Sequence, residues 1–313
     1  MSIELLALLL LVGEFLLYVG GVWVTFFRYG EFVQGAVALV ALPLLARLVV
    51  TLMSYALSRW KGMDLLPEQR LSPVAWLKFF IVEYGHLCIQ NLLLIPARGF
   101  FHTRSERGTG PITGRVLLLQ HGYVNNGAVW FFSARALEAR GYRVFTIDQP
   151  PFASIDIMGD LLAERVDEVL RIAGVSQLTL VAHSMGGLIC RAYLRRHGVG
   201  AGDKIDQLIT LGSPHQGTFH ARLAKGENGA QMRLGNTWLT SLGAMPVVIP
   251  FISIYSIHDT VIAPQDSSVM ADADNIQLFG VGHVSLPSGA VARTALIAAL
   301  ERHSAARAAQ IPM

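Results

Sequence analysis

The fold class of this chain is decided by the stretch Leu178-Thr179-Leu180-Val181-Ala182-His183-Ser184-Met185-Gly186-Gly187. The stretch begins as an apolar strand and runs into a helical segment, and Ser184 stands at the turn between them. Ala182 and Gly186 lie two positions to either side of the serine. Small residues let neighbouring backbone approach a tight turn that lifts the serine oxygen clear of a sheet, and the N-terminus of the following helix favours negative charge there. The pattern therefore predicts that Ser184 is a nucleophile.

From Arg115 onward, short apolar runs alternate with helical stretches. This alternation predicts βαβ units and a mostly parallel, doubly wound sheet of the α/β class. Continuous apolar strands are typical of such a sheet, because helices cover both of its faces. The expected strands are 116–120, 142–147, 178–182, 205–211, 251–256 and 276–281, and the expected helices are 128–140, 155–172, 185–196 and 290–302.

The composition points to a globular domain with an apolar appendage. Of the 313 residues, 52% are hydrophobic and 15% charged, against about 25% charged in a typical soluble domain. The apolar excess lies in the first hundred residues. A net charge of +3, without a Lys/Arg-rich stripe, makes nucleic-acid binding improbable. The two cysteines, Cys88 and Cys190, stand among apolar neighbours and are interpreted as buried free thiols.

Two long apolar runs open the chain, Leu5–Phe27 and Phe32–Leu57. Each has about the 20 residues that a helix needs to cross a bilayer. We therefore predict a transmembrane helical hairpin over residues 1–58. A secretory signal peptide is the alternative for the first run, but Glu4 replaces the usual basic residue and no small-residue cleavage motif follows.

One charge interrupts each of these runs. Glu14 lies 16 residues before Gly30 and Arg47 lies 17 residues after it. If the chain turns back at Gly30, the two opposite charges reach nearly the same depth. Because an unpaired charge inside a spanning helix is costly, we expect the two side chains to pair. The alternatives are that each reaches the interface separately or that one run lies on the membrane surface.

A third apolar stretch, Val74–Ile95, carries Glu83, His86 and Gln90 at helical spacing. One narrow polar face favours an interfacial helix under the catalytic domain, and a third membrane span is the alternative. Residues 59–114 are accordingly predicted to form this helix and a polar, Gly-containing linker.

The distribution of basic residues bears on orientation. Arg59, Lys61 and Arg70 follow the second run, whereas the turn holds only Arg28. With two spans, the positive-inside rule places the catalytic domain in the cytoplasm, with the hairpin in a membrane, taken to be a bacterial inner membrane. A third span would reverse this orientation.

Residues 115–313 resemble the small bacterial triacylglycerol lipases and esterases of the α/β-hydrolase fold. The resemblance rests on three features: Ala182 in place of the first glycine of the serine turn, the pair His121-Gly122 after a strand, and the segment Gly212-Ser213-Pro214-His215-Gln216-Gly217-Thr218. It implies a catalytic domain over 115–313, and the segment at about 218–246, which lacks a strand pattern, is expected to form a small cap.

An ester carbonyl under attack becomes an oxyanion that needs donors already in place. One donor is expected to be the N–H of Met185, the residue after the nucleophile. By the family pattern the other is the N–H of Tyr123, in the loop that follows the strand 116–120, and His121 shapes this loop. The alternative is that this loop is an ordinary glycine-containing turn.

The base and the acid are expected on loops after the last strands, in the order serine, acid, histidine. His283 follows the last expected strand and is our predicted base. Asp259 follows the strand 251–256, in an Asp-x-x-Val-x-x-Pro-like context that resembles the acid loop of the family, and is the predicted acid. Asp148 is its rival, although a plain loop role is expected for it.

These residues predict a membrane-anchored lipase or esterase that acts through an acyl-enzyme on Ser184. Acyl-enzyme chemistry requires no cofactor, and the sequence shows no metal-ligand spacing. The expected partners are ester substrates and membrane lipids, with no obligate protein partner implied. The alternatives are an acyltransferase or thioesterase with the same triad, or a catalytically silent membrane scaffold.

Overall fold

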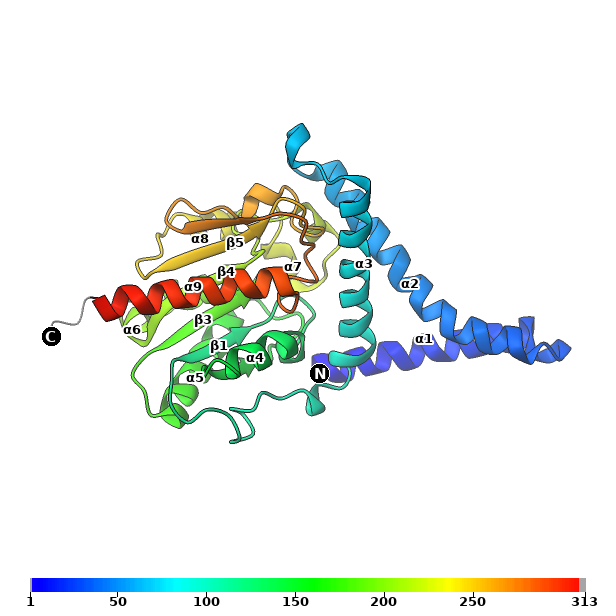
Figure 1. Ribbon diagram of the computed structural model, residues 1–313, viewed down its shortest axis with the longest axis horizontal. Coiled ribbons are helices and arrows are strands. Elements are labelled where there is room, and N and C mark those ends of the chain that lie inside the picture. Colours follow the sequence, from blue (N-terminus) through cyan, green and yellow to red (C-terminus); the bar gives the residue numbers. More distant parts are fainter. Residues whose placement is uncertain (1, 310–313) are drawn as a thin grey trace.

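The computed structural model describes residues 2–309, with side chains described except at 199–202 and 303–309. Its centre is a six-stranded parallel sheet in the order β2-β1-β3-β4-β5-β6 (Figure 1). The strands are β1 (Val116–Gln120), β2 (Arg143–Ile147), β3 (Leu178–His183), β4 (Ile205–Leu211), β5 (Phe251–Ser256) and β6 (Asp274–Leu278). The predicted parallel α/β sheet is confirmed.

Helices cover both faces of the sheet. Alternate residues of a strand point to opposite faces, so Leu118 packs with the helices of one face and Leu117 with those of the other. The first face holds α5 (Ile155–Ala173) and α6 (Met185–Lys204), and the second holds α4 (Phe131–Glu138) and α9 (Ala290–Ala309). This double cover explains why the central strands are largely apolar on both faces.

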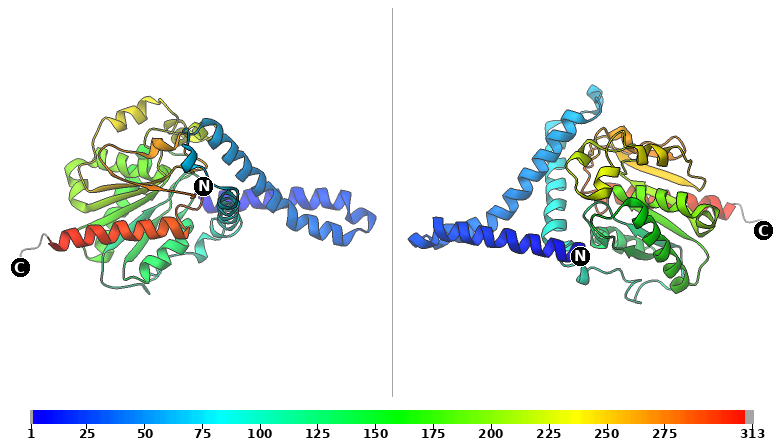
Figure 2. Two further views of the ribbon diagram at one scale, coloured as in Figure 1. Left: turned by 45° about the horizontal axis from the view of Figure 1, so that its top comes forward. Right: turned by 180° about the vertical axis from the view of Figure 1, so that it is seen from behind.

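Three helices precede the sheet: α1 (Ile3–Thr25), α2 (Phe32–Lys61) and α3 (Pro73–Ile89). The helix α3 continues as a π-helical turn, Gln90–Leu94. Figures 1 and 2 show α1 and α2 meeting at the end far from the sheet and spreading apart toward the domain, where α3 closes a triangle. The helix α3 stands across the edge of the sheet at which the strands end.

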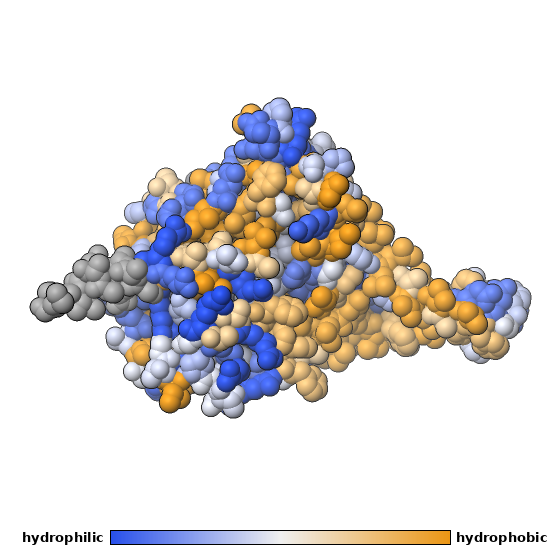
Figure 3. Space-filling model, in the orientation of Figure 1, coloured by the Kyte–Doolittle hydropathy of each residue, from blue (hydrophilic) through white to orange (hydrophobic). Residues whose placement is uncertain are grey.

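The helices α1 and α2 are long and apolar enough to cross a membrane. Their most apolar windows have a mean hydropathy of 2.3, and only 6% and 11% of those windows are buried, unlike the core helix of a globular protein. Figure 3 shows hydrophobic residues along the hairpin and hydrophilic residues at its tip.

Glu14 and Arg47 form an ion pair between α1 and α2, as expected from their equal distances to the turn. Tyr18 also donates a hydrogen bond to the Glu14 carboxylate. The two charges inside the apolar hairpin therefore neutralise each other, which reduces the cost of keeping them away from water.

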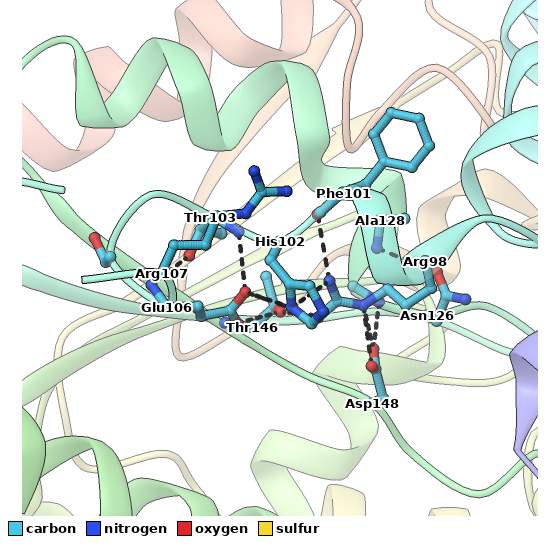
Figure 4. Close-up of polar contacts among 12 residues, drawn as sticks. Arg98, Phe101, His102, Thr103, Glu106, Arg107, Asn126, Ala128, Thr146 and Asp148 are labelled. Carbon is cyan, nitrogen blue, oxygen red and sulfur yellow. Dashed lines mark hydrogen bonds and ion pairs between the residues drawn. The ribbon is translucent and has the colours of Figure 1, made fainter. Parts of the chain in front are cut away.

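The linker between α3 and the sheet is anchored to β2 (Figure 4). The buried guanidinium of Arg98 contacts Asp148 at 3.0 Å and donates to Thr146 Oγ1 at 2.7 Å. Glu106 accepts from the N–H of Thr146 at 2.8 Å. The polar residues of this segment thus fix it to the end of β2, and Asp148 has the plain loop role expected for it.

Some element bounds differ from the sequence expectation. The last strand runs over 274–278 rather than 276–281, because 279–283 already bend toward the catalytic edge. The helix α6 is kinked at Gly198, where φ is +59°, and continues to Lys204. The segment 218–246 forms only short helices: a 3-10 turn (Phe219–Arg222), α7 (Gly226–Gln231) and α8 (Thr237–Gly243).

Candidate active site

Ser184 occupies the strained turn that the sequence predicts between β3 and α6. Its φ is +55°, in the left-handed region that residues with side chains rarely adopt. The serine N–H donates to the carbonyl of Leu211 at 3.0 Å, which ties the turn to β4. A Cβ on Gly186 would lie 2.7 Å from the His121 carbonyl oxygen, so only glycine fits there.

The loop after β1 passes directly beside the serine. A Cβ on Gly122 would lie 2.7 Å from the Ser184 Cβ, so this position also requires glycine. Val124, in this loop, has a φ of +47°, so its backbone is strained like that of Ser184. Within the described residues, the N–H groups of Tyr123 and Met185 donate no hydrogen bond. Both are therefore available to an oxyanion that forms beside Ser184.

Asp259 and His283 form a buried pair on the loops that follow β5 and β6. Asp259 Oδ2 lies 2.8 Å from His283 Nδ1. The other oxygen, Oδ1, accepts from the N–H groups of Val261 at 2.8 Å and Ile262 at 2.7 Å. These bonds fix the carboxylate so that it can orient the imidazole ring and stabilise its charged form.

The neighbouring carboxylates favour protonation of His283, whereas its burial opposes protonation. Burial lowers the pKa of this histidine, but the Asp259 carboxylate, with a smaller contribution from Glu83, outweighs the burial and raises the pKa above its ordinary value. The ring is accordingly disposed to accept a proton.

Gly212 joins this pair to the nucleophile. It follows Leu211, whose carbonyl accepts the serine N–H, and a Cβ on Gly212 would lie 3.4 Å from His283 Nδ1. The serine turn and the Asp259–His283 pair thus flank the end of β4. Among the described residues, Ser184 Oγ makes no hydrogen bond. The hydrogen bond between a serine nucleophile and its base often tightens only when substrate binds.

The other histidines near the site have packing roles. The Nε2 of His121 accepts the N–H of Gln149 at 2.9 Å, which shapes the loop after β1 as expected. His183 donates from Nε2 to the His283 carbonyl at 3.1 Å. His215 lies buried between Thr210 and Arg191. Burial lowers the pKa of all three rings and so favours their neutral form.

Glu83 of α3 contacts the His283 loop, a role that the sequence did not reveal. Its buried carboxylate accepts from the N–H groups of Val284 at 2.7 Å and Ser285 at 3.0 Å, and from Thr260 Oγ1 at 2.8 Å. Burial raises the pKa of this carboxyl. The sequence predicted the polar face of α3, and in the structure this face contacts the loop that carries His283.

Further side chains from the N-terminal helices hold the same two loops. Gln90 donates to the Val284 carbonyl at 2.8 Å, and His86 Nδ1 lies 2.9 Å from Ser288 Oγ. Ser58 of α2 donates to the Asp259 carbonyl at 2.5 Å. Their only signal in the sequence is their polarity in otherwise apolar helices.

No group of three or more His, Cys, Asp and Glu side chains suited to a metal ion is found among the described residues. Cys88 and Cys190 are free thiols, as interpreted from their neighbours; Cys190 is buried, whereas Cys88 is only partly buried, so the expected burial was wrong for Cys88.

Comparison with known proteins supports the class of this domain. Residues 115–228 match the family model of the alpha/beta hydrolase fold. The mature form of the Bacillus licheniformis lipase BlEst2 superposes with a TM-score of 0.53 at 18% identity, over 61% of this chain and 91% of that one. The globular part of the chain therefore has the α/β-hydrolase fold, and it is preceded by two apolar helices.

Two curated relatives each match about a third of this chain. Epoxide hydrolase 3 of Xenopus tropicalis is 28% identical over 112 residues, which are 34% of this chain and 29% of the relative. The pimeloyl-[acyl-carrier protein] methyl ester esterase of Aeromonas hydrophila is 34% identical over 106 residues, 32% of this chain and 38% of the relative. The chain thus spans only about a third of the length of these relatives, which support a hydrolase in the broad sense.

Proposed function

We propose that this chain is a membrane-anchored serine hydrolase that cleaves carboxylic ester bonds of lipids. The observation that carries the proposal is the strained Ser184 at the end of β3, flanked across Gly212 by the buried Asp259–His283 pair. A serine, a carboxylate and an imidazole in this chain order suit acyl transfer through a covalent ester intermediate.

In the proposed reaction, Ser184 Oγ attacks the ester carbonyl carbon while His283 Nε2 takes the serine proton. The N–H groups of Met185 and Tyr123 bind the oxyanion. His283 then returns the proton to the leaving alcohol, which leaves an acyl group on Ser184. A water molecule, deprotonated by the same ring, hydrolyses this ester and restores the serine. Asp259 holds the ring through Nδ1 and stabilises its charged form throughout.

The hairpin supports the membrane part of the proposal. A pair of apolar helices with exposed sides would be costly in water, whereas a bilayer covers them. At the end of α2, Trp60 is exposed and the Lys61 ammonium lies 3.8 Å from the centre of its ring. Such an amphipathic end is typical of the membrane–water interface. Arg59, Lys61 and Arg70 favour a catalytic domain on the cytoplasmic side.

An activity-based probe tests the enzymatic proposal. A fluorophosphonate should label the wild-type protein in membranes and fail to label Ser184→Ala. Ser241→Ala, which removes an exposed serine of α8, is the matched control and should keep full labelling. Labelling of Ser184→Ala at the wild-type level would refute Ser184 as the nucleophile. Turnover of p-nitrophenyl esters with and without an added alcohol distinguishes hydrolysis from acyl transfer.

A further inference from the structure

A cavity of about 480 Å³ lies between the N-terminal helices and the catalytic edge of the domain. This volume is within the range of small-molecule sites, about 300–1,000 Å³. Its walls are largely apolar and come from three helices: Leu6 and Leu10 of α1, Val50 of α2 and Leu87 of α3. The residues that line it on α1 extend from Ile3 to Glu14, about 16 Å along the helix axis. The cavity is therefore long and apolar.

The floor of the cavity belongs to the candidate active site. Tyr123 and Val124 form one part of the floor, and Val284 forms another. Tyr123 follows Gly122, the residue whose Cβ would contact the Cβ of Ser184, and Val284 follows His283. A ligand that fills the cavity thus ends beside both the expected oxyanion donor and the loop of the base.

The charges in the cavity wall are already compensated. Glu14 and Arg47 both line the cavity, and they pair with each other. The wall therefore offers no unpaired charge to an ionic ligand, whereas a neutral hydrocarbon chain can be buried there without leaving a charge unpaired. This favours an acyl chain over a polar substrate.

The surroundings indicate where such a chain comes from. The helices α1 and α2 diverge toward the domain, so the cavity lies inside the triangle that they form with α3 (Figures 1 and 2). The outer faces of the same helices are apolar (Figure 3). Resting on the proposed function, we propose that this cavity binds the acyl chain of a membrane lipid, which enters between the helices and presents its ester to Ser184.

A second apolar cavity provides a contrast. It measures about 400 Å³ and lies on the other side of α3, where Phe79, Val82 and Phe279 line it. It reaches Ser285 but neither Tyr123 nor Val124. A chain in this second cavity would not reach the expected oxyanion donors, so the first cavity is the acyl site.

Two adjacent valines of α2 allow a matched test. Val50 lines the cavity and Val49 does not, and they are similarly exposed, at 50% and 53%. Tryptophan at Val50 should fill the cavity, whereas tryptophan at Val49 should face lipid. The quantity to measure is the ratio of kcat/KM for p-nitrophenyl palmitate to kcat/KM for p-nitrophenyl butyrate. We expect Val50→Trp to lower this ratio by about 10-fold or more, because the tryptophan occludes the pocket for the long acyl chain. Val49→Trp should leave this ratio at the wild-type value.

Leu10 and Leu9 of α1 provide a second matched pair, since only Leu10 lines the cavity. An unchanged palmitate-to-butyrate ratio in both Val50→Trp and Leu10→Trp would overturn the acyl site while leaving the hydrolase intact. A wild-type protein without turnover of either ester would instead refute the proposed function.

A measurement without turnover tests the same site. In vesicles of phosphatidylcholine that carries a diazirine on its acyl chain, Ser184→Ala protein should crosslink at the cavity face of α1 and at Val50. Crosslinks spread equally over Val49, Leu9 and the cavity face would mean contact with bulk lipid only, and would overturn the proposal.

Discussion

The two halves of the candidate active site are supported in different ways. Ser184 and the expected oxyanion donors are held by backbone contacts inside the sheet domain, at Leu211, Gly122 and Gly186. The loops of Asp259 and His283 are held by side chains from the N-terminal helices, among them Glu83 and Ser58. The first half is thus held within the sheet domain, whereas the second is held both by that domain, at Val261 and Ile262, and by the helices that precede it.

The comparisons with relatives follow the same division. The match to the alpha/beta hydrolase model ends at residue 228, after the serine turn and before the acid and the base. Three predictions follow in order of decreasing expected effect. They concern the acid Asp259, its neighbour Glu83 on α3, and the ion pair of Arg47 inside the N-terminal hairpin.

The largest effect is expected for the acid. Asp259→Asn should lower kcat by about 10⁴-fold, because the amide no longer holds the catalytic tautomer of the imidazole. The Asp259 charge raises the pKa of His283, and the base must be neutral to act, so wild-type activity should fall as the pH drops through this raised pKa. Without the charge the pKa falls, and the acid limb of the kcat/KM–pH profile should move to lower pH. An acid limb that stays in place would refute the pairing of these residues.

A smaller effect is expected for Glu83. Its carboxylate accepts three hydrogen bonds and donates none, so an amide at this position would direct its N–H₂ group toward a donor. Glu83→Gln should lower kcat/KM by about 10- to 100-fold through misplacement of the His283 loop. Because Glu83 also contributes to the raised pKa of His283, the acid limb should move to lower pH, by less than in Asp259→Asn.

The pH profile separates this positioning role from simple packing. A lower melting temperature with an unchanged kcat/KM and an unmoved acid limb would reduce Glu83 to a structural contact. Lys78→Gln, at an exposed position on the same helix, is the control and should keep both the rate and the profile of the wild type.

The smallest effect is expected on abundance rather than on catalysis. Arg47→Leu leaves Glu14 without its partner inside the hairpin, and an unpaired charge near a helix centre costs about 2.5–3.5 kcal/mol on insertion scales. The amount of protein in the membrane fraction should fall. The double variant Glu14→Leu/Arg47→Leu should recover part of it, as measured by quantitative blotting of membranes. A double variant no more abundant than Arg47→Leu would argue against the pair as the reason for these charges.

The elements best predicted from the sequence are those with an unambiguous local pattern. The bounds of β1, β4 and β5 agree with the expectation, because each strand is largely buried and rich in apolar residues. The strand β6 was placed too late, since this edge strand has polar residues at Asp274, Asn275 and Gln277 and thus no apolar run to mark it. Local sequence describes a strand well only where both of its faces are buried.

The three candidate catalytic residues could be predicted from the sequence, but the contacts of the side chains that support them could not. Ser184 follows β3, and Asp259 and His283 lie on the loops after β5 and β6, so the topology of a parallel sheet places all three at one edge. The contact of Glu83 with the His283 loop could not be predicted, because the polar face of α3 does not say which surface it will meet. The same limit applies to Ser58, whose partner lies 201 residues further along the chain.

The carboxylate of Glu83 also constrains how such a protein can evolve. A recombination that joined a hydrolase domain beginning at residue 115 to an unrelated anchor would keep the whole sheet and the three candidate catalytic side chains. It would nevertheless lose the group that accepts the N–H bonds of Val284 and Ser285. The N-terminal helices and the sheet domain are therefore best inherited as one unit, and lineages that exchange the helices should carry a substitute acceptor on another segment.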